Sequence, residues 1–332
     1  VIGMGGTISA KPAGGKLKYG EIHMDELINY NRRLRESFDI KTMHLFRMDS
    51  SDMKPEHWLT LANTLYYNMG SYDGIVVTMG TDTLHYAAIA ISFLIQNNNI
   101  PIVFTGSKAD STLLNSDARR NLREAITVAA TADIAETIIV FNGKILRATR
   151  TKKVNASEYD AFMSTDGKPI GKAEEFIKLN APHRKRGKRK PVLYQNLDLD
   201  VATLKIYPGF DGNRIRHLVD DGATGLVIEG YGLGNIPLLD ASLKDNIYLV
   251  EREGIPVVLT SDCFLGEYWQ EIFESEIGTR LHGVKVIHCY DMLSETAYIK
   301  LMWVLTQARS YAEVKRMMLT DYAGEITVLG KV

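Results

Sequence analysis

Short runs rich in Val and Ile alternate with longer amphipathic stretches along most of the chain. Runs of this length and composition are typical of strands whose two faces are both buried. The pattern predicts eight strands, over residues 1–2, 74–78, 100–105, 137–141, 202–207, 225–229, 255–260 and 284–288.

Helical patterns with recognisable ends lie between several of these runs. Pro55 is placed to begin a helix whose apolar positions include Trp58 and Leu61, and Ser310 with Glu313 matches a capping box. Strands that alternate with helices predict parallel βαβ units, so the expected fold class is α/β.

The alternation stops between residues 162 and 200, where the chain carries three prolines and the basic stretch Arg-Lys-Arg-Gly-Lys-Arg-Lys at 184–190. A length of 332 residues also exceeds that of one ordinary hydrophobic core. We predict a larger N-terminal doubly wound domain with a mainly parallel sheet over 1–165. A linker over 166–200 and a smaller C-terminal α/β domain over 201–332 follow.

Small and hydroxylated residues gather directly after the predicted strands. The first strand continues into Gly-Met-Gly-Gly-Thr (3–7), the second into Met-Gly-Thr-Asp-Thr (79–83) and the third into Gly-Ser-Lys-Ala-Asp (106–110). The carboxyl ends of parallel strands form one crevice in a doubly wound sheet, and ligands bind there. We therefore place the candidate site at this edge.

Composition narrows the kind of partner. The formal net charge is −1, which favours a small molecule over nucleic acid or an anionic membrane. The chain has only two cysteines, Cys263 and Cys289, and they belong to no metal-binding or disulfide pattern. Such sparse use of cysteine is typical of a protein in the reducing cytoplasm. The basic stretch 184–190 is interpreted as a solvated loop, which is the usual setting for such runs.

The glycine-rich first turn suggests a nucleotide site only weakly, because Ile8 occupies the third glycine position of a dinucleotide-binding turn. The second turn places an alcohol beside a carboxylate. Thr83 is interpreted as the N-cap of the helix from Leu84, whereas Thr81 and Asp82 are candidates for chemistry. A threonine nucleophile needs a base, and Tyr19, Lys152 and Lys153 are the candidates.

Four motifs together resemble bacterial-type L-asparaginases, most closely the cytoplasmic type I branch with its archaeal members. They are Gly-Gly-Thr-Ile at 5–8, Asp-Ser-Ser-Asp-Met at 49–53, Met-Gly-Thr-Asp-Thr at 79–83 and Gly-Tyr-Gly-Leu-Gly-Asn at 230–235. The resemblance covers nearly the whole chain. It implies hydrolysis of the side-chain amide of L-asparagine to aspartate and ammonia.

The resemblance also implies catalytic roles. Thr7 matches the threonine usually taken as nucleophile, and Tyr19 matches a tyrosine in a mobile loop that assists it. Thr81, Asp82 and Lys153 match a triad that can activate an alcohol or a water molecule. Which threonine attacks first stays open, and no metal or other cofactor is implied.

Substrate recognition follows from the same resemblance. Asp82 is expected to pair with the α-ammonium of the substrate and Ser50 with its α-carboxylate, while backbone N–H groups around Gly6 and Thr81 form the oxyanion hole. The full set of expected substrate-binding residues is Gly6, Ser50, Ser51, Gly80, Thr81, Asp82, Ser107 and Asn235.

Members of this family assemble as dimers or tetramers, so we expect a homodimer or homotetramer that acts on L-asparagine in the cytoplasm, with no nucleic acid or membrane partner. Two alternatives stay open. One is the asparaginase-like subunit of a tRNA-dependent glutamine amidotransferase, which supplies ammonia to a partner. The other is an amino-acid-binding module that keeps the pocket without the chemistry.

Overall fold

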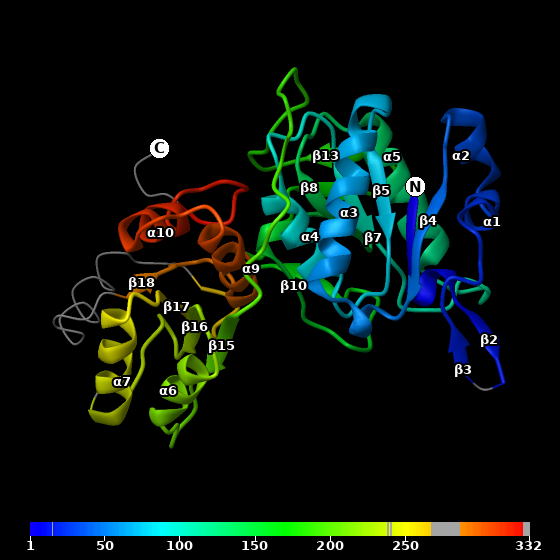
Figure 1. Ribbon diagram of the computed structural model, residues 1–332. Coiled ribbons are helices and arrows are strands. Elements are labelled where there is room, and N and C mark those ends of the chain that lie inside the picture. Colours follow the sequence, from blue (N-terminus) through cyan, green and yellow to red (C-terminus); the bar gives the residue numbers. More distant parts are fainter. Residues whose placement is uncertain (15, 238, 240, 267–285, 328–332) are drawn as a thin grey trace. The chain divides into compact units, whose positions relative to one another are not determined.

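The computed structural model describes the chain except for residues 15, 238, 240, 267–285 and 328–332. The chain divides into two compact units, Val1–Gln195 and Asn196–Val332. Figure 1 shows the elements of both units in sequence colours.

The first unit is built on an eight-stranded sheet. Its order is β13 (Ile177–Leu179), β12 (Gly171–Ala173), β9 (Lys144–Arg147), β8 (Thr137–Phe141), β7 (Ile102–Thr105), β5 (Ile75–Thr78), β1 (Ile2–Gly5) and β4 (Met43–Met48). The strands from β8 to β4 are parallel, and β9, β12 and β13 continue the sheet antiparallel. The chain passes from β1 to β4 on one side and then to β5 on the other, so β1 and β5 flank a topological switch point.

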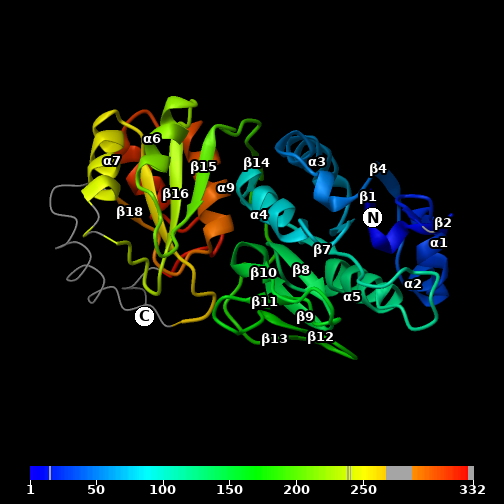
Figure 2. The same cartoon turned by 90° about the horizontal axis from the view of Figure 1, so that it is seen from below.

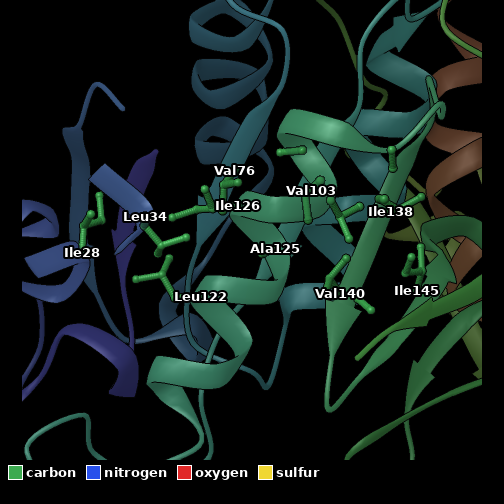
Figure 3. Packing of buried hydrophobic residues seen from close by; sticks show 14 of the residues in the cluster. Ile28, Leu34, Val76, Val103, Leu122, Ala125, Ile126, Ile138, Val140 and Ile145 are labelled. Atoms are coloured by element: carbon green, nitrogen blue, oxygen red, sulfur yellow. The ribbon is translucent and has the colours of Figure 1, made fainter. Parts of the chain in front are cut away.

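Helices cover both faces of this sheet. Helix α5 (Ala118–Thr131) packs on one face together with α1 (Met24–Asn29) and α2 (Arg32–Ser37), while α3 (Pro55–Asn68) and α4 (Leu84–Leu94) lie on the other (Figure 2). Figure 3 shows part of the apolar core, to which α5 contributes Leu122, Ala125 and Ile126 and the sheet contributes Val76, Val103 and Val140. Burial of the apolar surface on both faces explains why these strands are continuous Val and Ile runs.

Three two-stranded sheets complete the first unit. They are β2 (Lys11–Ala13) with β3 (Lys16–Lys18), β6 (Ile95–Gln96) with β14 (Val192–Leu193), and β10 (Thr151–Lys153) with β11 (Phe162–Ser164). The β10–β11 pair sets the direction of Lys153, which lies opposite Phe162 in the ladder.

The second unit is a smaller parallel α/β layer. Its sheet has the order β15 (Val201–Lys205), β16 (Gly225–Gly230), β17 (Val257–Ser261) and β18 (Ile287–His288). Helices α6 (Asn213–Asp220) and α7 (Ala241–Arg252) share one apolar cluster with the strands, and α9 (Ser294–Leu305) and α10 (Tyr311–Met318) follow along the chain.

These elements confirm the expected α/β class and the expected strands. For the strand predicted over 284–288, residues 284 and 285 lie outside the described residues, and the described part contains β18. The helix that begins at Pro55 and the cap formed by Ser310 are confirmed as well.

The stretch that the sequence assigns to a linker, residues 166–200, contributes structure to the first unit. Strands β12 and β13 extend the large sheet, and β14 pairs with β6. Each of these strands has only two or three residues, and a lysine interrupts the apolar pattern in both β12 and β13. Short edge strands with one solvated face carry too weak a periodicity to be recognised from sequence.

The basic stretch 184–190 is attached to the first unit through its arginines. The Arg186 guanidinium donates to the carbonyls of Ala132 and Ala129, each at 2.7 Å, and also to that of Asp73. Arg189 Nε donates to the Asn98 carbonyl at 3.1 Å. The contacts of Arg186 and Arg189 therefore attach the stretch to the first unit, while its lysines, Lys185, Lys188 and Lys190, are exposed.

A buried ion pair anchors the C-terminal segment of the second unit. Lys300 Nζ donates to the carbonyls of Met318 and Thr320 at 2.8 and 2.7 Å and lies 2.5 Å from Glu325, and both charged side chains are fully buried. A buried charge is tolerated when it is paired and hydrogen-bonded in this way. In the described part of the chain, no helix is both long and apolar enough to cross a bilayer.

Replacement of Arg186 by alanine should lower the free energy of unfolding by about 2 kcal/mol, because three carbonyl groups lose a charged donor. Lys188, an exposed residue of the same stretch, provides the matched control, and Lys188→Ala should change stability by less than about 0.5 kcal/mol. Urea unfolding of the two variants measures the difference. Equal stability would show that the arginine contacts are unimportant.

Candidate active site

The first two turns of the candidate site touch through their glycine backbones. Gly6 follows β1 with φ 76°, and a Cβ built on it would lie 2.0 Å from the backbone nitrogen of Gly80, which follows β5. Only glycine permits this approach, because it lacks a side chain and adopts positive φ readily. The contact brings Thr7 and Thr81 to the switch point between β1 and β5.

The turn after β4 packs against the second threonine turn. Ser50 is almost fully buried, and a Cβ built on Gly80 would lie 2.6 Å from its Oγ. The Ser50 hydroxyl accepts a hydrogen bond from the Asp82 N–H at 3.2 Å, and Thr83 Oγ1 donates to the Ser50 carbonyl at 2.6 Å. Thr83 occupies the N-cap position of α4 as expected, but its hydroxyl bonds to the neighbouring turn instead of capping the helix.

Lys153 joins the two polar residues of the second turn. Its Nζ donates to Thr81 Oγ1 at 2.9 Å and to Asp82 Oδ1 at 2.5 Å. The Lys153 side chain is 14% exposed, whereas 64% of the Asp82 side chain remains accessible. An amine in contact with an alcohol oxygen can exchange a proton with it, while the accessible carboxylate can still bind a cationic group.

Tyr19 lies near the carboxylates of this site. A hydrogen bond with Asp49 raises the pKa of Tyr19 to about 12, and partial burial and the negative charges of Asp49, Asp82 and Asp52 act in the same direction. Burial alone would raise the pKa of Asp49, but hydrogen bonds from Tyr19 and Ser51 hold it below its usual value. Tyr19 is therefore a proton donor near neutral pH, not a phenolate base.

The remaining expected residues lie in three places. Ser51 donates through N–H and hydroxyl to Asp49 at 3.0 and 2.9 Å. Ser107 is buried after β7, and its hydroxyl donates to the Ala109 carbonyl at 2.8 Å. Asn235 belongs to the second unit, in a turn where its N–H donates to the Tyr231 carbonyl at 2.7 Å, and its role at the site stays a prediction.

Sequence reasoning did not identify three residues around this site. Asp49 bonds Tyr19 and Ser51, and Lys108 follows Ser107 at the same sheet edge. His85 lies at the start of α4, where burial and the charges of Lys152 and Lys153 lower its pKa to about 3. Lys108 could have been identified from the sequence, because it lies in the turn that follows the predicted strand at 100–105. The contact of Tyr19 with Asp49 joins distant segments and leaves no local pattern.

Both units of the chain match models of known protein domains. Residues 1–185 match the model of the asparaginase N-terminal domain, and residues 200–318 match that of the glutaminase/asparaginase C-terminal domain. The chain belongs to the asparaginase family. It is therefore related to hydrolases of this family across both of its units.

Relatives with two different names are found within the family. A glutamyl-tRNA(Gln) amidotransferase subunit of Pyrococcus abyssi is 38% identical, over 98% of this chain and 76% of its own length. An L-asparaginase of Thermococcus kodakarensis is 35% identical over 98% of both chains. The solved structure of the thermostable L-asparaginase from Thermococcus kodakarensis superposes with a TM-score of 0.88 at 32% identity, covering 98% of each chain.

Substitution of Gly6 by alanine should lower the free energy of unfolding by about 3 kcal/mol or more, because the new methyl group overlaps Gly80 and the backbone has positive φ. Gly70→Ala is the control, since a Cβ there meets no atom within 4 Å, and it should change stability by less than about 1 kcal/mol. Denaturant unfolding compares the two. A well-folded Gly6→Ala protein of normal stability would contradict the close contact.

Asp49→Asn should return the pKa of Tyr19 toward about 10, because the hydrogen bond to a carboxylate is the main cause of its increase. The pKa of Asp49 is lower in the folded protein than in the unfolded chain, so the contribution of Asp49 to the free energy of unfolding is present above about pH 4 and is lost on acidification. The pKa of Tyr19 is raised, so the contribution of Tyr19 is complete below about pH 10 and is lost as the pH rises through about 12. The contact should therefore be intact from about pH 4 to about pH 10.

NMR titration of tyrosine labelled with ¹³C at Cζ measures this pKa, with Tyr19→Phe used to assign the signal. Asp52→Asn is the matched control, because Asp52 contributes only the last and smallest of the charges that raise the pKa of Tyr19. An unchanged Tyr19 titration in Asp49→Asn would disprove the contact.

Proposed function

We propose that the protein hydrolyses the side-chain amide of free L-asparagine to L-aspartate and ammonia. The observation that supports this proposal best is the contact of Lys153 Nζ with both Thr81 Oγ1 and Asp82 Oδ1. A hydroxyl held by an amine at a switch point beside a second threonine turn is suited to acyl transfer from an amide.

The proposed reaction has two displacements. In the first, a threonine oxygen attacks the amide carbon, its proton passes to a base, and the C–N bond breaks as the nitrogen takes up a proton and leaves as ammonia. In the second, water attacks the ester carbon, the bond to the threonine oxygen breaks, and a proton from the water returns to that oxygen. The aspartate side chain is released as a carboxylic acid, which ionises. Thr7, assisted by Tyr19, is the proposed nucleophile, and Thr81 with Lys153 transfers the protons.

The oxyanion formed in each displacement requires preorganised donors. The Gly6 N–H already donates to the Met48 carbonyl at 3.0 Å, and the Asp82 N–H donates to Ser50. We therefore assign the oxyanion hole to the N–H groups of Thr7 and Thr81.

Recognition of a free amino acid fits the charges of the site. Asp82 gives one oxygen to Lys153, and its accessible carboxylate can pair with an α-ammonium group. Ser50 and Ser51 are proposed to bind the α-carboxylate, which requires the Ser50 hydroxyl to exchange its present contact with the Asp82 N–H for the ligand. Peptide-bound asparagine lacks both charged groups and should be a poor substrate.

The second candidate is the ammonia-supplying subunit of a tRNA-dependent amidotransferase. The observation that favours it is the 38% identity to the amidotransferase subunit of Pyrococcus abyssi, which is slightly above the 35% identity to an L-asparaginase. The two functions share the amide hydrolysis and differ in whether ammonia is released freely.

The purified protein should release ammonia from free L-asparagine without tRNA or a partner protein. Thr7→Ala and Thr81→Ala should each lower kcat at least about a thousandfold, because each removes a hydroxyl on which the reaction depends. Thr60→Ala, on the exposed side of α3, should leave kcat unchanged. A coupled ammonia assay on L-asparagine, D-asparagine and L-glutamine provides the measurement.

The same assay separates the two candidates. Ammonia release that requires both charged tRNA and an added partner would favour the amidotransferase subunit over the free-standing enzyme. Near-normal kcat in either threonine variant would contradict the proposed mechanism.

A further inference from the structure

Lys108 lies in the turn that follows β7, beside the second threonine turn. Strands β5 and β7 pair Thr78 with Thr105, and both turns begin directly after this pair. The Met79 N–H donates to the Thr105 carbonyl at 3.1 Å, and a Cβ built on Gly106 would lie 2.4 Å from the Met79 carbonyl oxygen. The two turns are therefore in direct backbone contact.

The backbone of Lys108 is held by a buried carboxylate. Asp117 accepts hydrogen bonds from the N–H of Lys108 at 3.0 Å and from that of Ala109 at 3.0 Å. Asn121 donates to the same carboxylate at 2.9 Å and to the Gly106 carbonyl at 3.0 Å. The side chain of Lys108 thus extends from a fixed point.

The ammonium group of Lys108 reaches the segment that carries Lys153. It donates to the carbonyl of Ala156, three residues after Lys153 in the loop 154–161 that joins β10 to β11. Most of this loop is exposed, so hydrogen bonds rather than apolar burial determine its order. Asn155 Oδ1 accepts from the N–H groups of Ser157 and Glu158 within the loop, each at 2.8 Å, and the Lys108 contact ties the loop to another element.

Two further contacts hold the far end of the loop. Tyr159 Oη donates to the Asn115 carbonyl at 3.1 Å, and Lys144 Nζ lies 2.7 Å from the Asp160 carboxylate. The backbone of Lys153 is held in the β10–β11 ladder, and the adjacent Val154 N–H donates to the Ala161 carbonyl at 2.8 Å. Of the three side-chain contacts that tie the loop to other elements, the one between Lys108 and Ala156 is nearest to Lys153 along the chain.

Electrostatics agrees with this placement. Burial and the positive charge of Lys153 lower the pKa of Lys108, while Asp82 and Asp117 act in the opposite direction. The Lys108 ammonium thus interacts electrostatically with Lys153 and with Asp82, the carboxylate that Lys153 contacts.

We propose that Lys108 is a positioning residue, which holds the Ala156 carbonyl and thereby keeps Lys153 Nζ within hydrogen-bonding distance of Thr81. The inference rests on the proposed function, because Lys108 acts on the reaction only through Lys153. A displacement of about 1 Å at a group involved in proton transfer can cost about 100-fold in rate. The 2.9 Å contact of Lys153 with Thr81 leaves little tolerance for such a displacement.

Lys108→Met keeps the aliphatic chain and removes the donor, so it tests the proposal. Its kcat for L-asparagine should fall about 10- to 100-fold while KM changes less than about twofold, because the substrate contacts remain. Lys108→Arg retains a donor that can reach the Ala156 carbonyl and should recover most of the loss. Lys172→Met, at an exposed lysine paired with Glu174, is the matched control and should behave as wild type.

Hydrogen exchange provides a readout that does not depend on activity. Exchange in the peptide covering 154–160 should increase in Lys108→Met and remain at the wild-type level in Lys108→Arg and Lys172→Met. Unchanged exchange, an unchanged kcat, or a loss of kcat accompanied by a parallel rise in KM would each overturn the proposal. Wild-type protein that releases no ammonia would refute the proposed function, while the exchange experiment would still decide whether Lys108 orders the loop.

Discussion

The backbones of Gly6 and Gly80 meet where the sheet changes its winding direction, and the geometry of the candidate site follows from that contact. A side chain at either position would overlap the neighbouring turn, since a Cβ on Gly6 would lie 2.0 Å from Gly80 and one on Gly80 would lie 2.6 Å from Ser50 Oγ. Glycine at these two positions therefore lets the turns after β1, β4 and β5 pack closely, with the Ser50 side chain against Gly80. This close packing places Thr7, Thr81 and Asp82 in adjacent turns at one edge of the sheet.

The polar groups in these turns are largely committed to one another. Ser50 accepts from Asp82, Thr83 donates to Ser50, and Lys153 bonds Thr81 and Asp82. Such a network fixes side-chain orientation before a ligand arrives, which lowers the cost of organising the reacting groups. In the proposed mode of binding, the substrate displaces the contact between Ser50 and the Asp82 N–H.

The two threonines have unequal surroundings. Thr81 is nearly buried and bonded to Lys153, which comes from the β10–β11 pair much later in the sequence of the first unit. Thr7 is partly exposed at the start of a short 3₁₀ turn and precedes the β2–β3 hairpin and Tyr19. This asymmetry agrees with the proposed division of roles, in which Thr7 is the attacking hydroxyl and Thr81 with Lys153 transfers protons.

The sequence by itself determined the α/β class, the buried strands and the two threonine turns, because fully buried parallel strands have a continuous apolar pattern and strand ends at a sheet edge are local features. Tertiary structure alone decided which groups meet. The contacts of Tyr19 with Asp49 and of Lys108 with Ala156 join segments that are 30 and 48 residues apart. The arginines of 184–190 likewise find their carbonyl partners only in the folded unit. Hydrogen bonds between distant segments leave no periodic signal, because they depend on the direction of single side chains after the backbone has packed.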